Sequence, residues 1–126
     1  MLKITYLEDG IYVEYLQESV EAWKTRRILV SLRAGTSIYV ENITASLVLP
    51  TNIAYHAGLN ELAAKELIQI IPCDENYVEV ALSGNWVSQT KNSEAGVFVC
   101  ELNHSSEYFL YELWQESQVG TSLYVD

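Results

Sequence analysis

Residues 2–16 read LKITYLEDGIYVEYL, and this stretch carries the clearest structural signal in the chain. Leu2–Leu7 and Ile11–Leu16 are rich in β-branched and aromatic residues, and Glu8-Asp9-Gly10 lies between them. Asp-Gly between two such runs is typical of a tight hairpin, because the turn needs residues that tolerate positive φ. The stretch therefore predicts an antiparallel β-hairpin.

Further strands are expected outward from this hairpin. In Tyr77–Leu82, apolar residues alternate with other residues, which indicates a strand with one buried face. Gly84-Asn85 is then predicted to turn the chain into a second hairpin. By composition, the remaining predicted strands are Thr36–Glu41, Thr44–Leu49, Trp86–Gln89 and Val97–Leu102.

Two helices are predicted, at about residues 59–71 and 106–118. The first has apolar residues at helical spacing, with Asn60 as a possible cap and Pro72 as the stop. These apolar positions are Leu59, Leu62, Ala63, Leu67 and Ile70. In the second, Ser105 or Ser106 is the expected N-cap and Gly120 suits the residue after the helix. A strand over Glu107–Trp114 is the competing interpretation, because its aromatic residues also favour sheets.

Residues 20–34 give conflicting signals. Ser19 and Gly35 are well placed as helix boundaries, but residues 25–32, TRRILVSL, show no clean helical stripe and favour a strand. We expect a strand over Arg26–Arg33, preceded by a short helical turn.

Together these elements predict an α+β fold in a single compact domain spanning residues 1–126. The expected architecture is a mainly antiparallel sheet of six to eight strands with the two helices packed against it. Hairpins outnumber β-α-β units, which argues against a parallel sheet. A chain of 126 residues buries roughly two-thirds of its unfolded surface, enough for one sizeable core.

A heptapeptide occurs twice. Gly35–Glu41 and Gly120–Asp126 share five identities in seven positions. Either an ancient duplication or two uses of good strand-start chemistry would explain this. In both cases the C-terminal residues are predicted to form an ordered strand.

Charge restricts the classes of partner. The net charge is −10, with −1 in residues 1–65 and −9 in residues 66–126. A field of this sign repels phosphate backbones and anionic membranes, so neither nucleic acid nor membrane is an expected partner. The chain has no long apolar run and no secretory signal pattern, so a soluble, cytoplasmic protein is expected. Cys73 and Cys100 are then expected to be free thiols, with Cys100 buried.

No standard catalytic motif is present. The histidines, His56 and His104, and the two cysteines do not have metal-ligand spacing. We therefore expect no cofactor and no metal, and we lean towards a protein that is not an enzyme.

Two main function classes stay open, with a third beside them. The first is an interaction or regulatory module that binds a protein partner or itself, because nine Tyr and three Trp offer rigid contact area. Partners would carry a basic or apolar patch that suits the acidic C-terminal half.

The second class is a binding domain for a small anionic ligand, or a small enzyme, with a pocket between sheet and helices. Guanidinium groups suit oxyanions, and four cations fall within Lys24–Arg33. The candidate ligand-binding residues are Arg26, Arg27, Arg33, Tyr39 and His56. On a strand, Arg27 and Arg33 would share a face, with Arg26 on the opposite one. A mimic of nucleic acid, acting through an acidic face, is a third and minor alternative.

Overall fold

The computed structural model describes residues 1–66 and 68–125, and this part of the chain contains seven strands and four helices. The elements are β1 (Leu2–Leu7), β2 (Gly10–Tyr15), α1 (Val20–Ala34), β3 (Tyr39–Pro50), α2 (Thr51–His56), α3 (Leu59–Glu66), β4 (Gln69–Pro72), β5 (Tyr77–Ser88), β6 (Gly96–Cys100), α4 (His104–Ser117) and β7 (Gly120–Val125). The strands form one sheet in the order β2-β1-β6-β5-β3-β7, and β4 also pairs with β5. The predicted α+β fold with an antiparallel sheet is confirmed.

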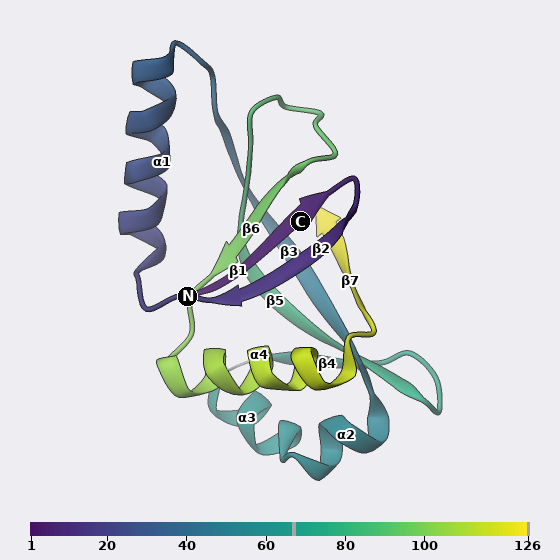
Figure 1. The fold of residues 1–126 in the computed structure, drawn as a ribbon. Coiled ribbons are helices and arrows are strands. Elements are labelled where there is room, and N and C mark those ends of the chain that lie inside the picture. The colour runs from purple at the N-terminus through teal and green to yellow at the C-terminus, as the bar shows by residue number, and fades with distance from the viewer. Residues whose placement is uncertain (67, 126) are drawn as a thin grey trace.

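The sheet is curled, and the main core lies on its inner face. The curl brings Tyr6 of β1 and Leu123 of β7 to the same core, although three strands separate β1 from β7 in the sheet order. Leu110 and Leu113 of α4 are buried in this core, together with Ala54 of α2 and Leu59 of α3. These three helices gather at one end of the sheet (Figure 1).

The single helix α1 lies on another side, away from the other three (Figure 1). It packs over a smaller apolar cluster formed by Met1, Trp23, Val87, Val97 and Val99. The sheet is therefore apolar on both faces, although the cluster beneath α1 is the smaller one.

The N-terminal hairpin forms as predicted. β1 and β2 pair antiparallel, with Leu7 opposite Gly10 at the turn and Ile4 opposite Val13. Gly10 has a φ of +155°, within the region that glycine adopts most easily. The next partner of β1 is β6, which comes from the far end of the sequence.

Two predicted breaks between strands are wrong. Thr36–Glu41 and Thr44–Leu49 give one strand, β3, which starts only at Tyr39. Gly84-Asn85 makes no turn, because β5 runs unbroken from Tyr77 to Ser88 beside the whole of β3. Gly84 is needed for close approach instead: a Cβ there would lie 2.8 Å from the ring of Phe98 and even closer to the Val99 carbonyl.

The predicted strand over Arg26–Arg33 is also wrong, because these residues belong to α1. Ser19 and Gly35 do bound a helix, as their residue types indicated: the Ser19 side chain caps the first turn, and Gly35 follows the helix at a φ of +71°. Local capping therefore outweighs the β-branched composition of the interior. On the helix, Arg26 and Arg33 lie seven residues apart and share a side, whereas Arg27 points elsewhere.

The predicted helix at about 59–71 is shorter in the structure. α3 ends at Glu66, and Gln69–Pro72 forms β4 along β5, while Leu67 lies outside the described residues. Asn60 is not a cap, because α3 already begins at Leu59. The short helix α2 was not predicted from the sequence.

The helix predicted at 106–118 is confirmed as α4, two residues longer at its start. Its N-cap is Asn103, whose side chain accepts the Ser106 N–H at 2.9 Å, and not Ser105 or Ser106. The helix ends at Ser117, and the left-handed residue after it is Gln118, at a φ of 47°, and not the predicted Gly120.

The repeated heptapeptide occupies unlike positions. Gly120 opens β7, which is the ordered C-terminal strand predicted from the sequence, although Asp126 lies outside the described residues. Gly35, in contrast, is the C-cap of α1, and three residues pass between it and the start of β3 at Tyr39. The two copies therefore give no structural repeat.

Candidate functional site

Helix α1 is anchored to the sheet mainly through its N-terminal half. The hydroxyl of Ser19 accepts the Ala22 N–H at 3.1 Å, and the Val20 N–H donates to a carboxylate oxygen of Glu101 at 2.7 Å. One turn later, Trp23 is only 4% exposed and packs into the cluster on the outer side of the sheet. These contacts fix where the helix starts.

The opposite side of α1 is aliphatic and open to solvent. Trp23 and Ser31 are the two buried residues of this fifteen-residue helix. Leu32 is 69% exposed and Leu29 49%. Leu32 lies nine residues after Trp23, which at about 100° per residue places it on the opposite side of the helix. We call the solvent-facing residues Thr25, Ile28, Leu29 and Leu32 the α1 outer face.

Sequence reasoning missed this face, because it placed Arg26–Arg33 in a strand. The helix boundaries at Ser19 and Gly35 were the available signal. Between such boundaries, Thr25, Leu29 and Leu32 follow the four- and three-residue spacing of one helical side.

Positive charge flanks the α1 outer face. The helix carries four cations and a single acid, Glu21, for a charge of +3. Since the whole chain carries −10, the residues outside α1 carry −13. Helix α1 is thus a positively charged segment of an otherwise acidic protein.

The three predicted arginines have different surroundings. Arg26 forms an ion pair with Glu18 at 2.5 Å, and this hydrogen bond raises the pKa of the guanidinium further. The guanidinium carbon of Arg27 lies 5.2 Å from the ring centre of Trp23, in a cation–π contact. Arg33 is exposed in the last turn of the helix.

A cleft of about 440 Å³ lies between α1 and the sheet. Arg27, Val30 and Ala34 line it from the helix, and Val87 and Val97 line it from the sheet. On the helix side, the hydroxyl of Ser31 donates to the Thr36 carbonyl oxygen at 2.8 Å, which ties the segment after α1 to the helix.

The five predicted ligand-binding residues do not form one site. Arg27 lines the cleft, whereas Arg26 and Arg33 do not. Tyr39 opens β3 at the end near α1, and it is 40% exposed without lining the cleft. His56 ends α2, beyond the far end of β3, so the whole length of that strand separates it from Tyr39 (Figure 1).

Exposed tyrosines are dispersed over the surface, with one local group at α4. Tyr108 is 49% exposed, and its ring lies 5.6 Å from Tyr15 and 6.4 Å from Tyr111, centre to centre. A hydrogen bond with Glu112 raises the pKa of the Tyr108 hydroxyl. We call the exposed residues Tyr108, Glu112, Gln115 and Glu116 the α4 outer face; it is aromatic and acidic.

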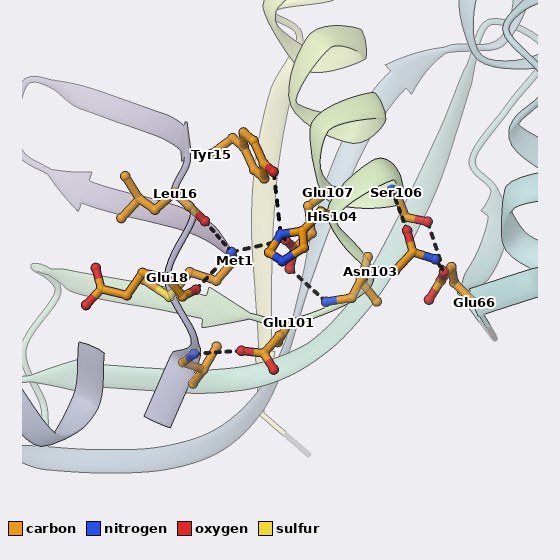
Figure 2. Close-up of polar contacts among 12 residues, drawn as sticks. Met1, Tyr15, Leu16, Glu18, Glu66, Glu101, Asn103, His104, Ser106 and Glu107 are labelled. Carbon is orange, nitrogen blue, oxygen red and sulfur yellow. Dashed lines mark hydrogen bonds and ion pairs between the residues drawn. The ribbon is translucent and has the colours of Figure 1, made fainter. Parts of the chain in front are cut away.

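A buried ion pair links the start of the chain to α4. Figure 2 shows the α-amino group of Met1 beside Glu107, at 3.1 Å, and both residues are fully buried. The same amino group donates to the Leu16 carbonyl oxygen at 2.6 Å. The second carboxylate oxygen of Glu107, Oε2, accepts the Leu102 N–H at 2.8 Å, whereas Oε1 is held by the ion pair with Met1 and accepts no hydrogen bond from the described residues.

The neighbouring contacts join α3 to the start of α4. Glu66 accepts hydrogen bonds from the side chains of Asn103 and Ser106, and Figure 2 shows these three residues together. His104 lies 3.6 Å from Glu107, with its ring exposed to solvent. These contacts join β1, α3 and α4 to one another, so the cluster stabilises the fold.

The two thiols have unlike environments. Cys100 is buried, as predicted, and burial raises its pKa to about 12. Cys73 is exposed, and its pKa is raised by local desolvation and by nearby Glu79 and Asp74. Neither thiol has the lowered pKa of a nucleophilic cysteine. Among residues 1–66 and 68–125, no group of His, Cys, Asp and Glu is arranged to hold a metal ion.

Comparison with known proteins gives one match. A family model described as Alr0857-like matches residues 1–118. No curated protein and no solved structure matches the chain. None of the helices in the described part of the chain is both long enough and apolar enough to span a membrane.

Proposed function

We propose that this chain, which belongs to the Alr0857-like family, is a non-enzymatic interaction module that pairs with a second copy of itself. The observation that carries the proposal is the α1 outer face. Three large aliphatic residues lie there in solvent, on a helix that already has its own contact with the sheet on the other side.

Burial of this face would stabilise a complex. Each Å² of apolar surface removed from water contributes roughly 25 cal/mol. Ile28, Leu29 and Leu32 fall within two turns of helix, so a single partner surface can cover all three. Contiguous exposed apolar groups with a polar rim are typical of interaction sites.

Charge favours a second copy as the partner. The α1 outer face lies between cations, and the complementary surface must therefore be acidic and offer apolar contact area. The α4 outer face has both properties: Glu112 and Glu116 supply the charge and Tyr108 supplies rigid contact area. In α4 there are three glutamates and neither lysine nor arginine. We therefore propose that α1 of one copy packs on α4 of the other.

Twofold symmetry doubles this contact. A helix of fifteen residues is about 22 Å long, so one α1–α4 contact is smaller than the roughly 800 Å² per partner of a standard stable interface. In a twofold pair, each copy contributes both helices, and the contact forms twice. This arrangement also uses tyrosines of α4, whereas the other exposed tyrosines are too dispersed to form one interface.

We further propose a cytoplasmic location, because both cysteines are free thiols, as suits a reducing compartment.

Solution mass across a dilution series tests the proposal. We expect a dimer at micromolar concentration that dissociates on dilution, and more readily at high salt. The double variant Leu29→Gln/Leu32→Gln should be a monomer at every concentration. Val119→Gln, which changes an apolar residue that is 41% exposed outside both faces, is the matched control and should dimerise normally.

Charge reversal tests the identity of the two faces. Variant A carries Arg26→Glu and Arg33→Glu on α1, and variant B carries Glu112→Lys and Glu116→Lys on α4. Each variant alone should be monomeric, because like charges then meet in both contacts. An equimolar mixture of A and B should dimerise, since opposite charges meet again in both. A wild-type chain that stays monomeric contradicts the proposal, and a mixture that fails to pair contradicts the α1–α4 contact.

A further inference from the structure

The cleft beneath α1 differs in charge from three larger hollows of the described chain. One of these, of about 490 Å³ beside the start of α2, contains the acid Glu75. A hollow of about 640 Å³ beside the β1–β2 hairpin contains Lys3 and Glu14, which pair with each other at 3.5 Å. A hollow of about 580 Å³ beside α3 contains the acid Glu66. The cleft beneath α1 has Arg27 as the one charged residue among those that line it, and it has no acid.

Arg27 is held in place yet has no anion. Within residues 1–66 and 68–125, no carboxylate lies within ion-pair distance of its guanidinium, whereas Lys24 and Arg26 on the same helix each have a glutamate. Stacking on Trp23 restricts the side chain without using its N–H groups. In a chain of charge −10, this leaves a guanidinium fork at the mouth of an acid-free cleft.

Beyond Arg27 the cleft has an apolar part that suits an aliphatic chain, and its polar lining residues are Thr5, Ser31, Thr36, Ser88, Gln89 and Ser93. Its apolar lining comes from both walls, with Val30 and Ala34 on the helix and Ile38, Val87 and Val97 opposite. Val87 and Val97 are buried beneath it. A volume of about 440 Å³ falls within the range of pockets that enclose small organic ligands.

From this arrangement we infer that the cleft binds an amphipathic molecule with a carboxylate head and an aliphatic tail. The head forms a two-pronged hydrogen bond with Arg27, and the tail lies along the valines between α1 and the sheet. The site is on the opposite side of α1 from its outer face, so this inference does not depend on the proposed self-association.

Titration with octanoate, followed by calorimetry and by amide NMR shifts of the isotope-labelled chain, tests the inference. We expect shifts centred on residues 30–38 and 87–97. Acetate, which has the head alone, and octanol, which has the tail alone, should bind at least tenfold more weakly. Lengthening the acid from hexanoate to octanoate should strengthen binding roughly threefold to fourfold per methylene.

Arg27→Gln is the central variant, because it removes the charge and retains a polar side chain. It should weaken octanoate binding by about tenfold or more, as expected for a hydrogen bond to a charged group. Arg33→Gln is the matched control on the same helix, outside the cleft, and should bind octanoate like the wild type. Ala34→Leu places added bulk in the cleft and should weaken binding of the longer acids most.

Three results would overturn the inference: no binding of octanoate, equal binding of octanol, or equal affinity in Arg27→Gln and the wild type. Circular dichroism of each variant establishes that α1 is folded. The solution mass of Arg27→Gln should equal that of the wild type, and Leu29→Gln/Leu32→Gln should still bind octanoate. A failure of the proposed octanoate binding is therefore distinguishable from a failure of the proposed self-association.

Discussion

The α-amino group of Met1 lies 3.1 Å from a carboxylate oxygen of Glu107, and both residues are fully buried. The pair ties the first strand of the hairpin to α4, two segments from opposite ends of the sequence. Backbone groups of Leu16 and Leu102 bond to the same amino group and carboxylate, which fixes the pair within the core.

Replacement of Glu107 by glutamine should therefore destabilise the protein. The variant leaves the ammonium group of Met1 buried without a counter-charge, and loss of one partner of a buried pair costs about 3–5 kcal/mol. Urea unfolding of Glu107→Gln measures this. Glu112→Gln, on the exposed side of the same helix, should change the free energy of unfolding by less than about 0.5 kcal/mol. Similar stability of the two variants would show that the pair contributes little.

Replacement of Trp23 by alanine should release α1 from the sheet. Trp23 is the one large side chain of α1 that is buried, and truncation of a buried aromatic costs about 3–5 kcal/mol. Hydrogen exchange should show faster exchange of the α1 amides, with the α4 amides less affected. Leu32→Ala, which trims a residue that is 69% exposed, is the control and should leave the exchange of α1 unchanged in the monomer. If the α1 amides exchange at the wild-type rate in Trp23→Ala, then residues other than Trp23 hold α1 on the sheet.

Replacement of Gly84 by alanine should disturb the centre of β5. The added methyl group meets the Phe98 ring and the Val99 carbonyl of β6, and overpacking of this kind costs about 1–3 kcal/mol. Gly120→Ala is the matched control, because nothing lies within 4 Å of a Cβ at that position. Thermal unfolding should show a clear loss of stability in the first variant alone, and equal melting temperatures would disprove the close approach.

The two thiols should react with a disulfide reagent at very different rates. Native protein should titrate one thiol, Cys73, and unfolded protein should titrate two, because Cys100 is buried with a pKa raised to about 12. Since the pKa of Cys73 is also raised from its ordinary value of 9.0, less than half of this thiol should be ionised at pH 9, and its rate there should be below half of the plateau rate at higher pH. Cys73→Ser should show no fast-reacting thiol in the native state.

Burial of Cys100 also predicts a pH dependence of stability. Its thiol loses a proton near pH 9 in the unfolded chain and near pH 12 in the folded chain. The stability that the buried, neutral thiol contributes to the folded state is therefore fully present below pH 9 and is lost as the pH rises from 9 to 12. Across that range the wild type should lose more stability than Cys100→Ala. Parallel stability curves for the two proteins would contradict this.

Turn residues and the spacing of apolar residues correctly predicted those elements in which this spacing follows the burial of the side chains. The β1–β2 hairpin follows from Asp9-Gly10, and the start of β5 follows from the alternation of Val78 and Val80 with less buried neighbours. The interior of α1 gave no such signal, because the helix buries little more than Trp23 on the sheet and so shows no inward stripe. Its β-branched and aliphatic residues then looked like a strand.

The cleft and the α1 outer face depend on contacts that no local pattern reveals. Arg27 was a candidate because it is an arginine in a cationic cluster, but its place beside Trp23 follows from the helix and not from the predicted strand. Gly84 looked like a turn because glycine has the same appearance in sequence whether it allows a bend or a close approach. His56 could not be separated from the arginines until the length of β3 was known.

Strand β7 has a consequence for the chain before it is complete. It covers the edge of β3 from Ile43 to Val48, and it comes after every other element in the sequence. A nascent or truncated chain that stops before Gly120 therefore leaves β3 with a row of unpaired N–H and C=O groups. An open edge of this kind is a template for strands of other molecules, so such chains should aggregate in proportion to their concentration.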